Sequence, residues 1–344
     1  MASVVRLMAL EAAADPAVEL TVAATYRDVG RLGRVLTWLT GVARVARRVL
    51  AGDVDVLHVH LSHGGSVVRK AIPMALARTR GVPIVLHAHS FNFATWFDAL
   101  PAAGRRVTRR VLRADTVVVL SPSQREVYRH RLATAPDRIE EVANPASLPD
   151  DERARSRVDD ATPMGVVFLG RYGERKGIGD LVAALTRLTP GERARLHVVT
   201  AGDGAIDQVR TDVAALGLDD TVEVRGWVEP AERDDLLARS EVFVLPSYDE
   251  ALPMALIEAM AFRLVPVVTP VGGLPDLVHD GDNGLLVRVG DPDAIAGALR
   301  WLLEHPEERR AIADRARASV ETLDAAGWWD RLTGIWSGLS GPRG

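Results

Sequence analysis

Two glutamates in the second half of the chain could bind a ligand. Glu258 is the only charged residue in the run 253–262, PMALIEAMAF, which starts with proline and continues with helix formers. A helix that is apolar on every side is normally buried, and a buried carboxylate needs hydrogen-bond donors. Those donors are either an arginine or backbone amides of the protein, or the hydroxyl groups of a ligand. Glu250 lies eight positions earlier, in the loop after the apolar run 241–245.

Two cations follow the first predicted strand of the second half. Arg171 and Lys176 lie five positions apart in the sequence GRYGERKG, and Lys176 is one of only two lysines against 40 arginines. Arginine donates two parallel hydrogen bonds and lysine supplies a compact charge, so together they are suited to a diphosphate. The alternative is a solvated loop, because basic residues usually face water.

Histidines cluster in the first half of the chain. His87 and His89 alternate in VLHAHSF, so both side chains should lie on the same face of a sheet. His58, His60 and His63 form a second group, but no convincing carboxylate arrangement accompanies them. The Asp-x-Asp motif that precedes this group lies at the start of a strand, away from its carboxyl end. We therefore expect no bound metal.

Alternating β-branched runs and helical patterns predict the elements that position these residues. The predicted strands are 19–24, 54–60, 83–89, 115–120 and 139–142, then 165–169, 195–200, 221–224, 241–245, 264–268 and 284–287. This alternation is typical of parallel, doubly wound sheets. The fold class is therefore α/β, with two Rossmann-like domains facing a cleft, where ligands bind at the carboxyl ends of the strands. We expect an amino-terminal domain at 1–149, a linker at 150–163, a second domain at 164–322, and a final helix at 323–344 that packs back on the body.

Composition limits the class of protein. The 344 residues are 47% apolar and carry a net charge of only -4, so nothing in the charge balance indicates a nucleic-acid partner. The absence of cysteine excludes disulfides and thiolate chemistry. No apolar stretch approaches the roughly 18 residues of a membrane span, and the amino terminus lacks a signal-peptide pattern. We expect a cytoplasmic protein.

The ordered motifs of the second half resemble the donor site of family 4 glycosyltransferases, which are retaining enzymes with the GT-B fold. The pattern Glu-x7-Glu is followed by PVVTPVGG, Asp276 and DGDNGLLV, and the resemblance covers most of 165–317 and, more weakly, the first half. The chain departs from the family at 251–253, where members often have Gly-Phe-Gly. The resemblance implies a metal-independent hexosyltransferase that moves a sugar from a nucleoside-diphosphate sugar to a hydroxyl of a glycan or glycolipid, as in polysaccharide biosynthesis, with no further cofactor.

The resemblance also implies roles for particular residues. Glu258 would hold the ribose hydroxyls and Glu250 would lie against the donor sugar. Arg171 and Lys176 would bind the diphosphate in place of a metal. His89 best matches the histidine that lies near the transferring carbon.

Further donor contacts are implied in three loops. Because the first residue of the helix 253–262 is a proline without an N–H, phosphate contacts there would come from Met254 and Ala255. Gly272 and Gly273 would approach the donor, and Trp227 occupies the region beside the base. Two alternatives stay open: a nucleotide-sugar epimerase of the same fold, and a non-catalytic nucleotide-sugar-binding protein.

A basic helix in the first half predicts a second kind of partner. In GRRVTRRVLR, five arginines fall within an arc of about 140°, with Val107 and Val111 opposite. Such a face can bind anionic lipid headgroups, as a peripheral membrane protein does, or it can be a solvated face. These residues are Arg105, Arg106, Arg109, Arg110 and Arg113.

The opening of the chain predicts a further feature. Residues 1–14 have a helical pattern, whereas in the resembled family a strand and a Gly-Gly loop precede the first helix. We expect that the functional start lies upstream of Met1, or that this chain is a truncated form whose first domain lacks its opening strand.

Overall fold

The structure is a computed structural model that describes residues 2–27, 29–146, 148–150, 154 and 163–340. It divides into two compact units, of which unit 1 comprises residues 1–143 and 326–344 and unit 2 comprises residues 144–325. Most of the predicted linker, 150–163, lies outside the described residues. Each unit is built on its own parallel sheet, so the predicted α/β class is confirmed.

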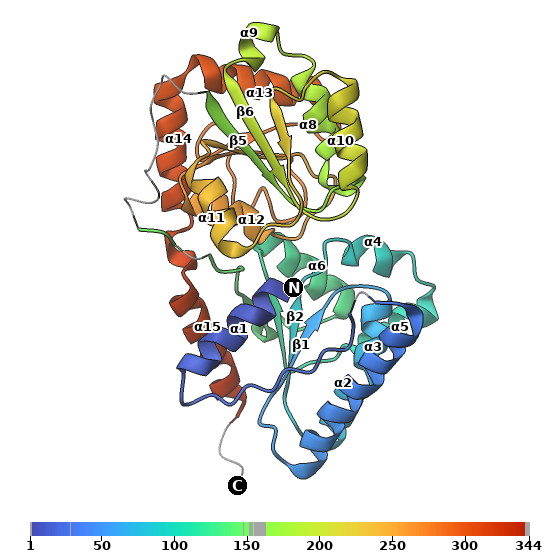
Figure 1. The fold of residues 1–344 in the computed structure, drawn as a ribbon. Coiled ribbons are helices and arrows are strands. Elements are labelled where there is room, and N and C mark those ends of the chain that lie inside the picture. Colours follow the sequence, from blue (N-terminus) through green and yellow to red (C-terminus); the bar gives the residue numbers. More distant parts are fainter. Residues whose placement is uncertain (1, 28, 147, 151–153, 155–162, 341–344) are drawn as a thin grey trace. The chain divides into compact units, whose positions relative to one another are not determined.

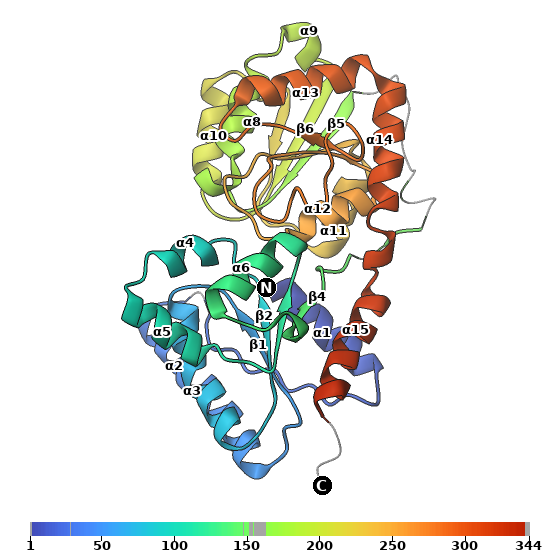
Figure 2. The same ribbon diagram turned by 180° about the vertical axis from the view of Figure 1, so that it is seen from behind.

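Unit 1 contains a four-stranded parallel sheet in the order β1-β2-β3-β4. The strands are β1 Leu57–Leu61, β2 Ile84–Ala88, β3 Thr116–Val119 and β4 Ile139–Glu141, which confirms four of the predicted strands. The helices are α1 Ala2–Ala14, α2 Arg31–Ala51, α3 Gly65–Thr79, α4 Phe93–Asp98, α5 Ala102–Val111, α6 Pro122–Leu132 and α15 Ala325–Leu339. Figures 1 and 2 show α2, α3 and α5 together on one side of this sheet, with α1 and α15 on the other.

The strand predicted at residues 19–24 is wrong. This segment forms no strand and lies along α2, where Arg48 contacts Glu19 at 3.0 Å and Arg44 donates to the carbonyl of Val22 at 3.1 Å. A strand satisfies its backbone groups only beside another strand, and among the described residues β1 pairs with β2 alone. Polar and apolar side chains alternate in this segment as in a strand, but no neighbouring strand pairs with it among the described residues.

The final helix packs within unit 1. Trp328, Trp329 and Leu332 of α15 are buried, and the indole N–H of Trp329 donates to Asp15 at 2.9 Å. The predicted helix over residues 1–14 is confirmed as α1, which ends just before this aspartate.

Unit 2 contains a six-stranded parallel sheet in the order β10-β9-β8-β5-β6-β7. The strands are β5 Met164–Leu169, β6 Leu196–Ala201, β7 Val222–Val224, β8 Val242–Leu245, β9 Val265–Val268 and β10 Leu285–Leu286, which confirms all six predictions for this half. The helices are α8 Ile178–Leu185, α9 Pro190–Arg193, α10 Ile206–Ala215, α11 Pro230–Ala238, α12 Met254–Ala261, α13 Pro292–Glu304 and α14 Pro306–Ala318.

The strand order of unit 2 fixes where a ligand can bind. Every residue of β5, β8 and β9 is buried, as expected for strands covered on both faces. The chain runs from β5 outward through β6 and β7, then returns to β8 on the other side of β5. The strand order therefore reverses between β5 and β8, and ligands of doubly wound sheets bind at the carboxyl ends of the strands where the order reverses.

No helix in the part of the chain that the structure describes is both long and apolar enough to cross a membrane.

Candidate active site

The loops that follow β5 and β8 touch at a glycine. Gly177, between the loop 170–176 and α8, has a φ of 68°, and a Cβ there would lie 2.0 Å from the carbonyl oxygen of Pro246. Any other residue would push the two loops apart, and φ in this range favours glycine. The glycine therefore holds the side chain of Lys176 beside the loop that carries Glu250.

Glu250 is a buried carboxylate surrounded by donors. Its side chain is 7% exposed and forms an ion pair with Lys176, whose side chain is 13% exposed. The same oxygen accepts hydrogen bonds from the hydroxyl of Ser247 at 3.0 Å and from Arg175 at 3.3 Å. The structure thus brings two of the predicted site residues, Glu250 and Lys176, into direct contact.

Gly272 presses the loop after β9 against Glu250. Its φ is 56°, and a Cβ there would lie 1.7 Å from the carbonyl oxygen of Glu250. The next residue, Gly273, donates its backbone N–H to the carbonyl of Ala251 at 2.8 Å. Both predicted glycines therefore lie at the site, and Gly272 has a stereochemical reason to be glycine.

Glu258 lies buried in α12 and has an arginine partner. Arg233 of α11 donates to Oε1 at 2.7 Å, so one of the two sources of donors expected from sequence is present. Burial raises the pKa of Glu258, Arg233 opposes this rise, and Asp234 adds to it. Among the described residues the contact of this carboxylate with Arg233 is made by Oε1.

Arg171 follows the carboxyl end of β5, Trp227 follows that of β7, and both residues are exposed. The Arg171 side chain is 63% exposed and lies 3.6 Å from Asp203, apart from the buried ion pair. Trp227 is 69% exposed, and the carbonyl of Gly226 next to it accepts from the backbone of Gly202 at 3.1 Å. The structure does not join these two side chains to the buried pair, but it leaves both open to a ligand.

The first turn of α12 points free backbone amides out of the helix. The first amides of a helix have no acceptor within it, and Pro253, which precedes α12, has no N–H of its own. Met254 and Ala255 are half-buried and follow directly. They are placed to donate to an anion, as the sequence predicts.

Sequence reasoning missed three residues that hold the glutamates. Arg175 and Ser247 bind Glu250, and Arg233 binds Glu258. Arg175 stands within the sequence GRYGERKG and could have been found there. Arg233 comes from another helix, 25 positions before its partner, and no spacing rule connects the two.

A hollow of about 850 Å³ in unit 2 lies away from this chemistry. Gly165, Leu196 and Thr221 line it, and they lie at or just before the amino ends of β5, β6 and β7. Because ligands of doubly wound sheets bind at the carboxyl ends, the hollow is not a candidate for the same site.

In unit 1, four histidines from β1 and the end of β2 pack their rings together. The prediction that His87 and His89 share a face is confirmed, since their ring centroids lie 4.1 Å apart. His60 Nδ1 lies 2.8 Å from His89 Nε2, and His58 Nε2 lies 3.1 Å from His87 Nδ1. His63 lies apart from this group and contacts Ser90 at 2.8 Å.

The pKa of each of these four histidines is lowered, and burial is the largest cause in every case. The pKa of His60 falls to about 3. All four rings are therefore neutral near pH 7, each with one N–H and one acceptor nitrogen.

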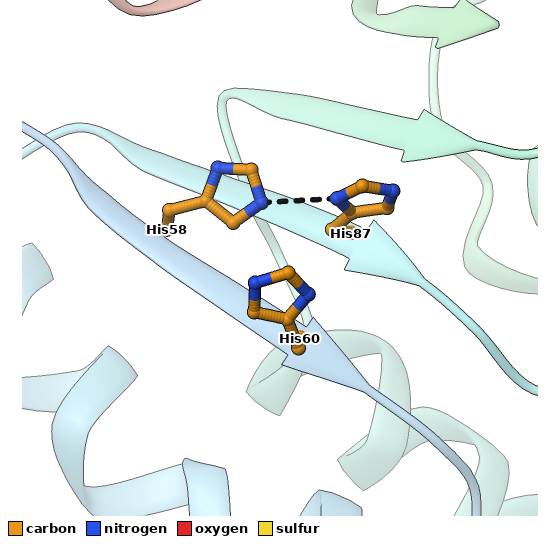
Figure 3. Close-up of side chains that lie close together, drawn as sticks. All are labelled: His58, His60 and His87. Atoms are coloured by element: carbon orange, nitrogen blue, oxygen red, sulfur yellow. Dashed lines mark hydrogen bonds between the residues drawn. The ribbon is translucent and has the colours of Figure 1, made fainter. Parts of the chain in front are cut away.

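The tautomers of two rings follow from the indole of Trp336. An indole N–H can only donate, and it lies 3.0 Å from His58 Nδ1, so the proton of His58 is on Nε2. That proton is donated to His87 Nδ1 (Figure 3), which places the proton of His87 on Nε2. His87 Nε2 is buried and has no hydrogen-bond partner among the described residues.

The donor atoms of His58, His60 and His87 lie within 4.8 Å of one another, close enough to consider a metal ion. A metal-binding histidine donates its other ring N–H to an acceptor, whereas the other nitrogen of His58 accepts from Trp336. Coordination through His58 Nε2 would require removing the only N–H proton of the neutral ring, which would leave an imidazolate. The hydrogen bonds thus favour a chain of neutral rings over a metal site in this arrangement.

Comparisons with known proteins agree with this architecture. The family model "Glycosyltransferase Family 4" matches residues 5–148, and "Glycosyl transferases group 1" matches residues 150–319. A D-inositol 3-phosphate glycosyltransferase of Streptosporangium roseum is 30% identical over 90% of this chain and 76% of its own. The alpha-D-kanosaminyltransferase of Streptomyces kanamyceticus is 29% identical over 89% of this chain and 84% of its own.

Solved structures show the same fold. Sucrose-phosphate synthase from Thermosynechococcus elongatus has a TM-score of 0.75 at 22% identity, covering 94% of this chain and 86% of its own. Alr3699/HepE of Anabaena, in complex with UDP-glucose, has a TM-score of 0.69 at 19% identity, covering 87% of this chain and 82% of its own. The two parallel sheets and these structures define the GT-B fold, and the two family models show that the chain is a glycosyltransferase of this fold. The chain belongs to the family 4 glycosyltransferases.

Proposed function

We propose that the protein is a retaining, metal-independent hexosyltransferase that moves a sugar from a nucleoside-diphosphate sugar to a hydroxyl of a glycan or glycolipid. The observation that carries the proposal is the buried pair of Glu250 and Lys176 between the loops after β5 and β8. Removing two charges from water costs free energy, and ion pairs buried at this cost often lie where a charged ligand binds. A protein of the same fold, Alr3699/HepE, has been solved with UDP-glucose, which supports a donor of this class.

The donor is held by the strand ends of unit 2. Oε2 of Glu258 accepts from the ribose hydroxyls, and Trp227 lies beside the base. The diphosphate is bound by Arg171, by Lys176 and by the first amides of α12, Met254 and Ala255.

The sugar lies between the remaining loops of the site. Glu250, backed by Gly272 and Gly273, faces its hydroxyls, and His89 is the proposed catalytic histidine.

The reaction exchanges one glycosidic bond for another. The bond from the anomeric carbon to the diphosphate breaks, the acceptor oxygen bonds to that carbon on the same face, and the acceptor proton passes to the departing phosphate. Negative charge grows on the diphosphate in the transition state. Lys176 and Arg171 stabilise that charge, which is the role a divalent cation has in other transferases.

The proposal is tested by incubating the protein with nucleoside-diphosphate sugars, with and without hydroxyl acceptors, in the presence of a chelator. We expect release of nucleoside diphosphate that rises when an acceptor is added, and an anomeric configuration in the product equal to that of the donor by NMR. Conversion of the donor sugar into its epimer would indicate an epimerase instead. Binding without any turnover would indicate a non-catalytic protein.

The Glu258→Gln variant is expected to bind nucleoside diphosphate about tenfold more weakly, because the amide makes weaker hydrogen bonds to ribose than a carboxylate. The melting temperature should fall only slightly, since Arg233 keeps its contact with Asp234 at 2.8 Å. Calorimetric titration and thermal unfolding measure the two effects. Asp234→Asn is the matched control, because it removes the other partner of Arg233 and leaves the ribose site intact. If both variants melt earlier and neither changes the affinity, Glu258 serves only the ion pair.

A further inference from the structure

An apolar stripe on α2 of unit 1 faces solvent. Leu32, Val35, Leu36 and Leu39 are 75, 51, 53 and 50% exposed and lie within an arc of about 100° of the helix. Gly41, a buried residue of the same helix that lies against the carbonyl of Ala24, falls on the opposite side. Leucines one helical turn apart that are half or more exposed are not isolated surface residues, and such patches mark interaction surfaces.

The stripe continues onto the neighbouring helix. Val68 and Ile72 of α3 are 72 and 49% exposed and lie one helical turn apart. The indole of Trp38 in α2 donates to the carbonyl of Arg69 in α3 at 3.2 Å, so the two helices lie side by side, as Figures 1 and 2 show. Tyr26, itself 44% exposed, lies between the guanidinium groups of Arg34 and Arg69, 5.6 and 4.8 Å from its ring centre.

The charge of these helices has one sign. The segments α2, α3 and α5 carry five, three and four Arg or Lys residues, and none of them contains Asp or Glu. Arg78 of α3 donates to the carbonyls of Val111 and Arg113 at the end of α5, which joins the third helix to the other two. Arg48 is paired with Glu19 and Asp53, and Lys70 donates to Thr25, so the other basic residues form the positive surface.

The valines that lie opposite the arginines of α5 are not the residues that bury this helix. Val107 is 60% exposed on the outer side, whereas Thr108 and Leu112 are the buried residues. Arg109 is engaged with the Phe97 ring and with the carbonyl of Arg131. The helix adds Arg106 and Arg110, and Arg113 just after it, to a surface whose apolar part lies on α2 and α3.

We propose that this surface, made of α2, α3 and α5, binds an anionic lipid bilayer, with the leucines of α2 inserted at the level of the headgroups. An amphipathic helix with arginines beside an apolar face has the composition of helices that lie in the membrane interface. A second copy of the chain would bring two positive surfaces together, which disfavours self-association. A nucleic acid would match the arginines but would leave the leucines without a partner.

Flotation with lipid vesicles tests the proposal. The wild-type protein is expected to float with phosphatidylcholine vesicles that contain about 30 mol% phosphatidylglycerol, and not with pure phosphatidylcholine. Salt at about 0.5 M should weaken the binding, because it screens the arginines. Replacing two inserted leucines, in Leu36→Glu/Leu39→Glu, should reduce partitioning at least about tenfold.

Further variants show whether the loss of flotation is specific to this surface. Leu216→Glu changes a leucine with the same 50% exposure in unit 2 and should float like the wild type. Arg106→Glu/Arg110→Glu alters no buried residue and should also lose binding to the anionic vesicles. Release of nucleoside diphosphate from the donor in vesicle-free buffer should persist in all three variants, so this inference and the proposed function fail separately.

Three results would overturn the proposal. The first is a wild-type protein that stays with the aqueous fraction, and the second is full flotation of Leu36→Glu/Leu39→Glu. The third is a dimer in sedimentation velocity that those two substitutions dissociate, which would assign the surface to a second copy.

Discussion

Replacing Lys176 by alanine is expected to lower the rate of sugar transfer about 10²- to 10³-fold, a loss of roughly 2 to 4 kcal/mol of transition-state stabilisation. The ammonium group is largely removed from water by the loops around it, so its interaction with a growing phosphate charge is only weakly screened. Arg171→Ala should act in the same direction with a smaller effect, because its side chain is 63% exposed. Steady-state rates with saturating donor, measured with and without EDTA, give both values.

The matched control is Arg175→Ala. Arg175 also binds Glu250, at 3.3 Å, so this variant weakens the support of the carboxylate without removing the cation assigned to the diphosphate. A loss below about tenfold is expected. If Arg175→Ala is as inactive as Lys176→Ala, the lysine acts only by holding Glu250. Loss of wild-type activity in EDTA that magnesium restores would show that a metal supplies the charge.

The strands of unit 2 could be predicted closely because the buried strands are continuous apolar runs in the sequence. Runs such as that of β5 are apolar at every position, and such runs are stable only inside a covered parallel sheet. The segment 19–24 shows the limit of that argument. Its residues alternate as a half-buried strand does, yet strand formation depends on a neighbour, and the pattern of one segment contains no information on what lies beside it.

The sequence could predict which residues form the candidate site, but only partly which of them contact one another. The position of Glu250 and Lys176 after parallel strands implies that both lie at the same edge of the sheet. Their direct contact depends on the φ of Gly177 and on its approach to Pro246, which the sequence shows only as one glycine among 29. The partner of Glu258 comes from another helix, so only the three-dimensional packing could identify it.

The histidines of unit 1 illustrate the same limit. Alternation placed His87 and His89 on one face, but the contact of His58 with Trp336 joins residues 278 positions apart. That contact decides which ring nitrogens carry protons, and it makes the group a hydrogen-bonded part of the core.

Acidification from about pH 7.5 to pH 5 is therefore expected to destabilise unit 1. The pKa values of His58, His60, His87 and His89 are lowered in the folded state, while unfolded histidines titrate near pH 6.5. Below that pH the unfolded chain binds protons that the folded chain rejects, so the free energy of unfolding falls as the pH falls. The stabilisation is complete above about pH 6.5 and is lost progressively below it.

The slope has a predictable size, because each histidine held neutral contributes about 1.4 kcal/mol per pH unit below its unfolded pKa. The fully buried His87 alone accounts for about 2 kcal/mol at pH 5, and the partly exposed rings add less than this each. Hydrogen exchange should show faster opening of β1 and β2 at pH 5, after correction for intrinsic exchange rates, with β5 and β8 of unit 2 as the internal reference.

His87→Leu should flatten the dependence of the unfolding free energy on pH by about 1.4 kcal/mol per pH unit, whatever its effect on stability at pH 7.5. Equal slopes in the wild type and His87→Leu would mean that His87 takes up its proton in the folded protein. One ring in the buried hydrogen-bonded series Trp336, His58 and His87 would then have to carry a positive charge. The tautomers assigned from the indole donor would be wrong.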